Sequence, residues 1–184
     1  MKLQRGGIVT IALMLLVIVA IATYIVFFID ESEVQKRDNT PAAQALLVEN
    51  PENSFTDLGG TPVSTTDYFG KIIIVTSWAS WCPQCTDSLR DLGTIAQEYK
   101  ERDVVVLAIN RAENRYTAER FLSTISVAPE LTIVLDPSDH YFGASTGYAM
   151  PETIVYTKDG EVNLHQRGNV QLDEIRAHLD ELQK

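Results

Sequence analysis

The two cysteines of the chain, Cys82 and Cys85, are separated by only two residues, Pro83 and Gln84. A disulfide stabilises a fold chiefly by closing a loop in the unfolded chain, and a loop of four residues gives little such constraint. A structural bridge is therefore a poor explanation for this pair. The spacing favours a reactive pair that alternates between dithiol and disulfide.

Two other cysteine chemistries find less support in the sequence. A zinc site needs further ligands at a suitable spacing, and the histidines His140, His165 and His178 are scattered along the chain. We therefore expect no metal and no other cofactor. A peroxidatic cysteine of the peroxiredoxin type follows a Pro-x-x-x-Thr-x-x-Cys pattern, which the residues before Cys82 lack. A thiol peroxidase nevertheless stays open as an alternative.

The position of the pair at a predicted helix start assigns the two sulfurs different roles. Apolar residues recur at helical spacing over 83–100, and Pro83 suits the first turn of a helix. Unpaired amides at a helix N-terminus favour a thiolate and lower its pKa. We expect Cys82 to be the exposed nucleophile there. Cys85 shares the apolar stripe with Leu89, so we expect it to be the shielded, resolving thiol.

Strand and helix signals alternate along the rest of the domain. The patterns predict strands at 55–58, 62–64, 72–76, 104–109, 131–135, 153–156 and 161–165, and helices at 83–100, 116–125, 140–146 and 171–182. This order predicts an α/β fold with a central mixed β-sheet, helices on both faces and an N-terminal β-hairpin.

The composition excludes some functions. A chain of 184 residues allows one ordinary domain with an appendage. Its formal net charge of −10 argues against nucleic-acid binding, which needs clustered Lys and Arg.

The N-terminal segment predicts a single transmembrane helix. Basic residues precede an uncharged, largely apolar run at 8–29, and acidic residues follow it. Such a helix is about 33 Å long, enough to cross a hydrocarbon core of about 30 Å. The charge bias places residues 1–7 in the cytoplasm, with a linker at 30–53 and a domain at 54–184 outside the cell membrane. A cleaved signal peptide, ending near Ala20-Ile21-Ala22, is the alternative. Both interpretations export the domain.

Three segments of the domain resemble the TlpA/ResA-like branch of the thioredoxin superfamily. They are FTDLGGTPV at 55–63, GKIIIVTSWASWCPQC at 70–85, and the run from YFG at 141–143 through GYAMPET at 147–153 to KDG at 158–160. The resemblance spans residues 54–182 and implies a thioredoxin-like fold.

The resemblance also implies the rest of the site. It implies that Pro151 is cis and lies opposite Cys82, leaving the backbone of Met150 free to pair with an extended substrate. It places Trp81 beside the nucleophile, on the rim of the substrate groove. It also gives Pro83 a part in substrate binding.

Two positions depart from the family pattern. Thioredoxins carry a buried Asp where this chain has Thr76, and many ResA-like proteins carry Glu where it has Ser88. The proton acceptor for Cys85 is therefore open. Asp87, Glu152 and water are the candidates.

The resemblance implies a thiol–disulfide oxidoreductase that acts on cysteines of exported proteins. It suggests a reductant, supplied with electrons by a membrane thiol transporter, with apocytochrome c maturation as a possible role. A non-catalytic thioredoxin-fold binding module is the alternative from another class, although such a module has no need for Cys82 and Cys85.

Overall fold

The computed structural model describes residues 14–15, 17–18 and 55–184. None of the helices in these described ranges is long and apolar enough to cross a membrane. The predicted cytoplasmic segment at 1–7, the linker at 30–53 and nearly all of the predicted anchor at 8–29 lie outside the described residues.

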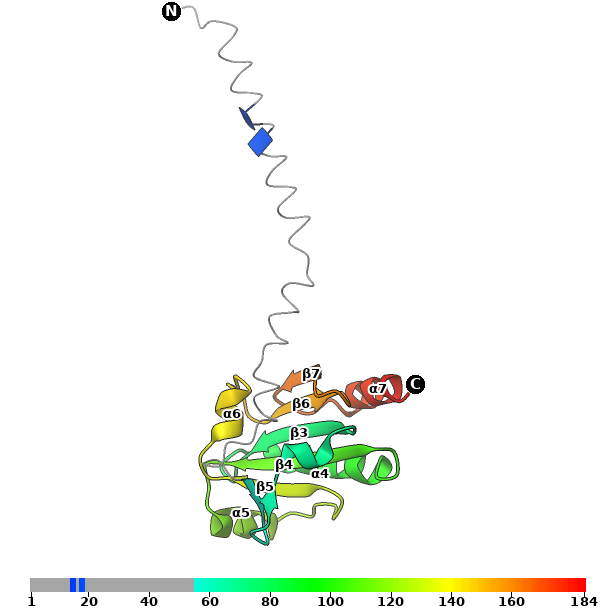
Figure 1. The fold of residues 1–184 in the computed structure, drawn as a ribbon. Helices are drawn as coiled ribbons and strands as arrows, with labels where there is room; N and C mark the ends of the chain where they lie inside the picture. Colours follow the sequence, from blue (N-terminus) through cyan, green and yellow to red (C-terminus); the bar gives the residue numbers. More distant parts are fainter. Residues whose placement is uncertain (1–13, 16, 19–54) are drawn as a thin grey trace, which may run out of the picture. The chain divides into compact units, whose positions relative to one another are not determined.

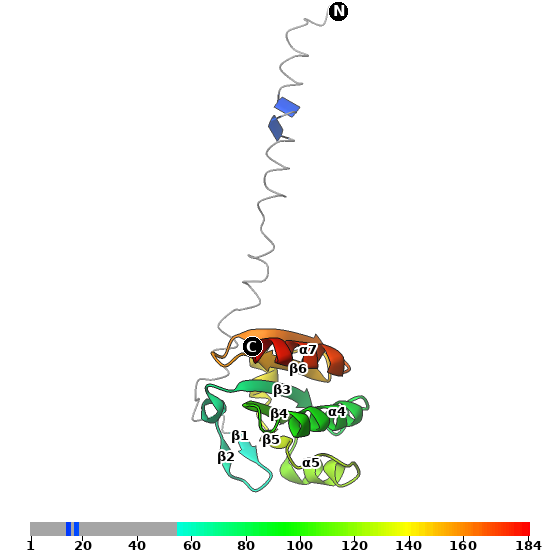
Figure 2. The same ribbon diagram turned by 90° about the vertical axis from the view of Figure 1, so that its right-hand side faces the viewer.

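A seven-stranded mixed sheet forms the centre of the domain (Figures 1 and 2). The strands are β1 (Phe55–Asp57), β2 (Pro62–Val63), β3 (Ile72–Trp78), β4 (Val104–Arg111), β5 (Thr132–Asp136), β6 (Glu152–Tyr156) and β7 (Val162–Arg167), in the spatial order β2-β1-β5-β4-β3-β6-β7. The pairs β3–β4 and β4–β5 are parallel, and the other pairs are antiparallel. All seven residues of β3 are buried, as its apolar, β-branched sequence predicts.

Helices cover both faces of this sheet. The helices are α4 (Cys85–Glu98), α5 (Arg115–Leu122), α6 (His140–Ala144) and α7 (Leu172–Leu182), with a 3-10 turn, η1 (Thr65–Tyr68). Side chains of α4, α5 and α7 join one apolar cluster, which contains Trp78 of β3. Tyr141 of α6 joins the cluster on the other face, with Ile73 and Val75 of β3. Figure 1 shows α6 on the opposite side of the sheet from α4 and α7.

The prediction of a mixed sheet with helices on both faces and an N-terminal hairpin is confirmed, although several boundaries differ. The hairpin β1–β2 joins the main sheet through β5, and η1 follows it in a segment for which no element was predicted. Helix α4 begins at Cys85, two residues later than expected, because the amide of Cys85 donates to the carbonyl of Cys82 (3.2 Å) in a turn that precedes the helix. Helix α5 begins after Asn114, whose side chain accepts from the amide of Thr117 and caps the helix.

The second predicted hairpin is also present. Strands β6 and β7 are antiparallel neighbours, and the turn between them contains Gly160 at φ 81°. Glycine suits this position because a side chain would strain a left-handed backbone. Since β6 also pairs with β3, this hairpin fixes the residues before Glu152 against the end of the central strand.

Candidate functional site

Cys82 and Cys85 are joined by a disulfide at the start of α4 (Cα–Cα 5.4 Å). The loop from Ala79 to Cys82 connects the end of β3 to this helix, and the amide of Cys82 donates to the carbonyl of Ala79 (3.1 Å). The side chain of Gln84, at the N-cap position, makes no capping hydrogen bond. The disulfide therefore lies where first-turn amides of a helix remain without a side-chain cap.

Cys85 is fully buried (0% exposed), which confirms its predicted shielding. The prediction of an exposed Cys82 is wrong for this disulfide state, in which the residue is 3% exposed. The bond to the buried sulfur of Cys85 holds Cys82 in the apolar cluster that contains Trp78 and Leu89. The exposed residues next to the disulfide are Trp81, Pro83 and Gln84, and Trp81 is 60% exposed.

The peptide bond between Met150 and Pro151 is cis, as predicted. Ser77 of β3 is the register partner of Glu152 in β6, so continuing this antiparallel pairing by one residue places Pro151 beside Trp78 at the end of β3. Met150 packs against the apolar cluster that holds both cysteines. Its backbone amide and carbonyl make no hydrogen bond within the described part of the chain. These two polar groups are available to an extended partner.

Glu113, which the sequence analysis missed, holds the loop that leads to Cys82. Its carboxylate accepts from the backbone amide of Ser80 (2.9 Å), the hydroxyl of Ser80 (2.5 Å) and the side-chain amide of Asn110 (2.7 Å). Asn110 is buried at the end of β4 and pairs in register with Trp78 of β3. One sequence feature could have indicated Glu113. An Asn stands at the end of an otherwise apolar strand, and a Glu follows it three residues later.

The carboxylate of Glu152 is buried (1% exposed) and contacts three nitrogen atoms. They are Nε2 of His165 (2.5 Å), Nε of Arg167 (3.3 Å) and the backbone amide of Tyr148 (3.2 Å). The neighbouring Thr153 contacts Thr76 on the disulfide face of the sheet, and successive strand residues point to opposite faces. Glu152 therefore points to the face opposite Cys85, so this geometry gives no support to a proton relay by Glu152.

Asp87, the other candidate relay, points to solvent. Its side chain is 82% exposed and forms an ion pair with Arg90 (3.3 Å). The one-residue shift from the buried Ser88 turns it away from the apolar side of α4 by about 100°. The structure does not bring Asp87 to Cys85.

Hydroxyl groups occupy the two positions where the family pattern has carboxylates. Thr76 is buried, and its Oγ1 accepts from Oγ1 of Thr153 (3.0 Å). Ser88 is also buried, and its hydroxyl donates to the carbonyl of Gln84 (3.3 Å). Neither position places a carboxylate within the apolar cluster around Cys85.

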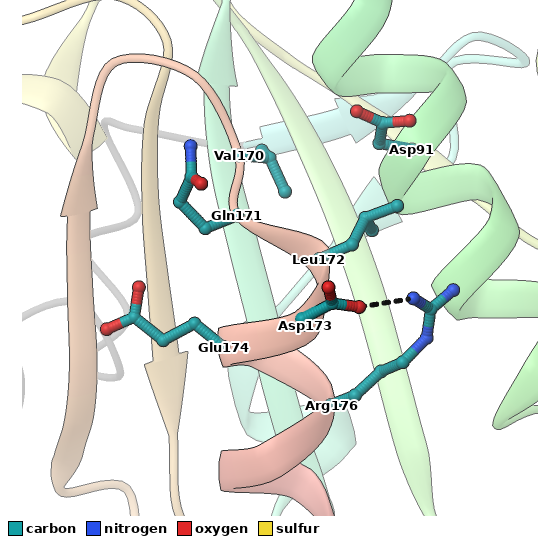
Figure 3. Close-up of a pocket in the computed structure, with 7 residues that line it drawn as sticks. All are labelled: Asp91, Val170, Gln171, Leu172, Asp173, Glu174 and Arg176. Atoms are coloured by element: carbon teal, nitrogen blue, oxygen red, sulfur yellow. Dashed lines mark hydrogen bonds and ion pairs between the residues drawn. The ribbon is translucent and has the colours of Figure 1, made fainter.

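A shallow polar groove lies between α4 and the loop that enters α7 (Figure 3). It is lined by Asp91, Val170, Gln171, Leu172, Asp173, Glu174 and Arg176. Arg176 pairs with Asp173 (3.2 Å) in this groove. Neither cysteine lines it, so it is separate from the disulfide. Within the described ranges, no three His, Cys, Asp or Glu side chains gather in a way that could hold a metal ion.

The hydrogen bonds of Glu113 yield a prediction about the disulfide loop. Glu113→Ala should lower the free energy of unfolding by about 1–3 kcal/mol, because donors of Ser80 and Asn110 lose their acceptor. Ser80→Ala removes only one donor and should cost about 0.5–1.5 kcal/mol. Urea denaturation with the disulfide intact measures both changes. Glu119→Ala, on the exposed side of α5, is the matched control. A loss for Glu113→Ala no larger than that of the control would contradict the role assigned to Glu113.

Comparison with known proteins agrees with this geometry. A family model described as Redoxin matches residues 22–179. The chain is 27% identical to the thiol-disulfide oxidoreductase ResA of Geobacillus kaustophilus over 184 residues, covering 99% of each chain. It is 26% identical to ResA of Geobacillus thermodenitrificans over 132 residues, covering 72% of this chain and 75% of that protein.

Solved structures share the fold. A putative thiol:disulfide interchange protein DsbE from Chlorobium tepidum superposes with a TM-score of 0.65 at 23% identity, covering 71% of this chain and 92% of that one. The exposed lipoprotein thioredoxin Etrx1 of Streptococcus pneumoniae superposes with a TM-score of 0.63 at 25% identity, covering 70% of this chain and 97% of that one. With its disulfide-bonded Cys-x-x-Cys pair at a helix start, the chain belongs to the Redoxin family and is a ResA-like thiol–disulfide oxidoreductase.

Proposed function

We propose that the enzyme reduces disulfides of exported proteins through the Cys82-Pro83-Gln84-Cys85 motif. The observations that support this proposal are a Cys82–Cys85 disulfide at the start of α4, a cis peptide bond at Pro151 next to the strand that pairs with β3, and a backbone of Met150 without a hydrogen bond in the described part of the chain. A substrate strand that pairs with Met150 would lie next to the reactive sulfur.

The proposed reaction is two successive thiol–disulfide exchanges. In the reduced enzyme, the Cys82 thiolate attacks one sulfur of a substrate disulfide, which forms a mixed disulfide and releases one substrate thiolate. Cys85 then loses its proton to solvent and attacks the Cys82 sulfur, which releases the second substrate thiolate. The substrate gains two electrons, and the enzyme is left with the Cys82–Cys85 disulfide seen here.

The neighbours of the two cysteines support this division of labour, although both residues are buried in the disulfide state. Cys85 is enclosed in the apolar cluster, where a protein-sized substrate cannot reach its sulfur. Cys82 is the residue that adjoins the exposed Trp81 and Pro83. We therefore assign the attack on the substrate to Cys82, which is next to the exposed residues, and the resolving step to Cys85.

The location and partners of the enzyme form the second part of the proposal. An N-terminal anchor at residues 8–29 would hold the domain at the outer surface of the cell membrane, where a membrane thiol transporter would re-reduce the disulfide. The apolar run between basic and acidic residues supports this arrangement. Cysteine pairs of apocytochromes c are the candidate substrates suggested by the resemblance to the ResA-like branch.

Serine substitutions separate the two thiols. In an insulin-reduction assay, Cys82→Ser should reduce turnover to the uncatalysed rate, because the attacking sulfur is absent. Cys85→Ser should accumulate a mixed disulfide with insulin, because the resolving sulfur is absent. Mass spectrometry detects this adduct, and excess dithiothreitol should release it. Wild-type turnover in both variants would rule out the proposed chemistry.

The reduction potential tests the direction of electron flow. A reductant should equilibrate near thioredoxin, at about −270 mV, whereas a strong oxidant lies near about −120 mV. Equilibration of the Cys82–Cys85 pair with glutathione buffers measures this value. A potential near the oxidant end would overturn the assignment as a reductant while leaving the exchange chemistry intact.

A reporter fusion tests the location of the domain. β-Lactamase fused after Lys184 should protect bacterial cells from ampicillin, because the reporter acts only outside the cytoplasm. A matched fusion that lacks residues 1–29 should give no protection. The full-length fusion should stay in the membrane pellet at its full mass. Release of a shortened protein would instead show that the N-terminal segment is a cleaved signal peptide.

A further inference from the structure

The loop at 168–171, between β7 and α7, is bonded to the cis proline. The amide of Gly168 donates to the carbonyl of Pro151 (2.8 Å). Because Glu152 and Arg167 are register partners in β6 and β7, this bond continues the antiparallel pairing of the two strands by one residue. It fixes the carbonyl of the residue that directly follows Met150. The position of this loop therefore affects the direction in which the free backbone groups of Met150 point.

The same loop also contacts the apolar cluster around the disulfide. Val170 is 8% exposed and belongs to the cluster that contains Cys82 and Cys85. Val170 also lines a second shallow groove, together with Asp87 and Ser88 of the first turn of α4. The loop therefore lies beside the helix that begins at Cys85 as well as beside the cis proline.

Gln166 holds the other end of the loop. Its side chain is buried (7% exposed), and its Oε1 accepts from the backbone amide of Gln171 (3.1 Å). Its Nε2 donates to Oε2 of Glu174 in the first turn of α7 (2.6 Å). A side-chain amide supplies the acceptor and the donor that these two bonds require. Figure 3 shows Gln171 and Glu174, the two residues that Gln166 joins, where the loop passes into α7.

The register of β7 places Gln166 on the face of the sheet that carries the disulfide. Its partner in β6 is Thr153, whose hydroxyl contacts Thr76 on that face. Register partners in antiparallel strands point to the same face of a sheet. Gln166 therefore supports the loop from the side of Cys85, whereas the carboxylate of Glu152 lies on the other side.

We propose that Gln166 is a positioning residue for substrate binding. It holds the 168–171 loop at Gln171, and Gly168 holds the carbonyl of Pro151, so the backbone of Met150 keeps the orientation with which an extended substrate pairs. This inference rests on the proposed function, because it requires a substrate strand beside Met150. A hydrogen bond of ordinary net strength changes an equilibrium constant by about three- to tenfold, which sets the size of the expected effect on KM.

Two substrates test the inference with the reduced full-length enzyme. They are the disulfide-linked dimer of the peptide Gly-Ser-Cys-Ser-Gly, which can pair with Met150, and 2-hydroxyethyl disulfide, which has no peptide backbone. Gln166→Met keeps the length of the side chain and loses both of its hydrogen bonds. It should raise KM for the peptide by about three- to tenfold. The value of kcat and the rate with 2-hydroxyethyl disulfide should stay at the wild-type level, whereas general damage to the fold would lower both.

An exchange of two side chains tests the hydrogen bonds themselves. Gln166→Glu alone brings a second carboxylate against Glu174 and should also raise KM for the peptide. Gln166→Glu combined with Glu174→Gln restores both bonds, with donor and acceptor exchanged between positions 166 and 174, and should return KM to near the wild-type value. Glu181→Gln, at an exposed position of α7, is the matched control and should change nothing.

Three outcomes would overturn the inference while leaving the exchange chemistry in place. They are an unchanged KM in both single variants at position 166, an equal loss of rate with the two substrates, and no recovery in the exchanged pair. Failure of the wild type to reduce the peptide, with 2-hydroxyethyl disulfide still reduced, would overturn the proposed function together with the inference.

Discussion

The site depends on the hydrogen bonding of strand β3 on both sides. β3 is parallel to β4 and antiparallel to β6, and all of its side chains are buried. A strand in this position cannot slip by one residue without moving its buried side chains to the wrong face. The same register therefore places three segments at the carboxyl end of β3. They are the loop before Cys82, the loop after β4 and the cis proline. This register fixes the positions of the groups that surround the Cys82–Cys85 pair.

Two carboxylates hold the loops at this end of β3. Glu113 accepts hydrogen bonds from Ser80 and Asn110, and Glu152 accepts one from the amide of Tyr148 and pairs with His165 and Arg167 of β7. Each joins a loop next to the disulfide to a regular element of the sheet. Each is surrounded by donors, so loss of either carboxylate leaves several polar groups unpaired. The loop before Cys82 and the loop before β6 are therefore held by different carboxylates.

Features encoded in short stretches of sequence could be predicted, and features that depend on distant contacts could not. The cysteine pair, the strands and helices, and the cis bond at Pro151 follow from local patterns and a family resemblance. Glu113 binds Ser80 across 33 positions of sequence, so the local spacing of Asn110 and Glu113 does not reveal this contact. The orientation of Glu152 depends on the β3–β6 register, and the burial of Cys82 depends on its contacts with the apolar cluster around Trp78 and Leu89.

The two edge strands of the sheet differ from Met150 in how readily an extended polypeptide could pair with them. One edge strand, β2, has only two residues and contains Pro62, which lacks an amide hydrogen. The other, β7, pairs with β6 through an irregular register and carries Arg167. Both edges are poor templates for adding a foreign strand. The backbone of Met150 is different, because its amide and carbonyl make no hydrogen bond within the described part of the chain. The edge strands therefore disfavour strand addition, whereas Met150 keeps two polar groups for the extended substrate proposed above.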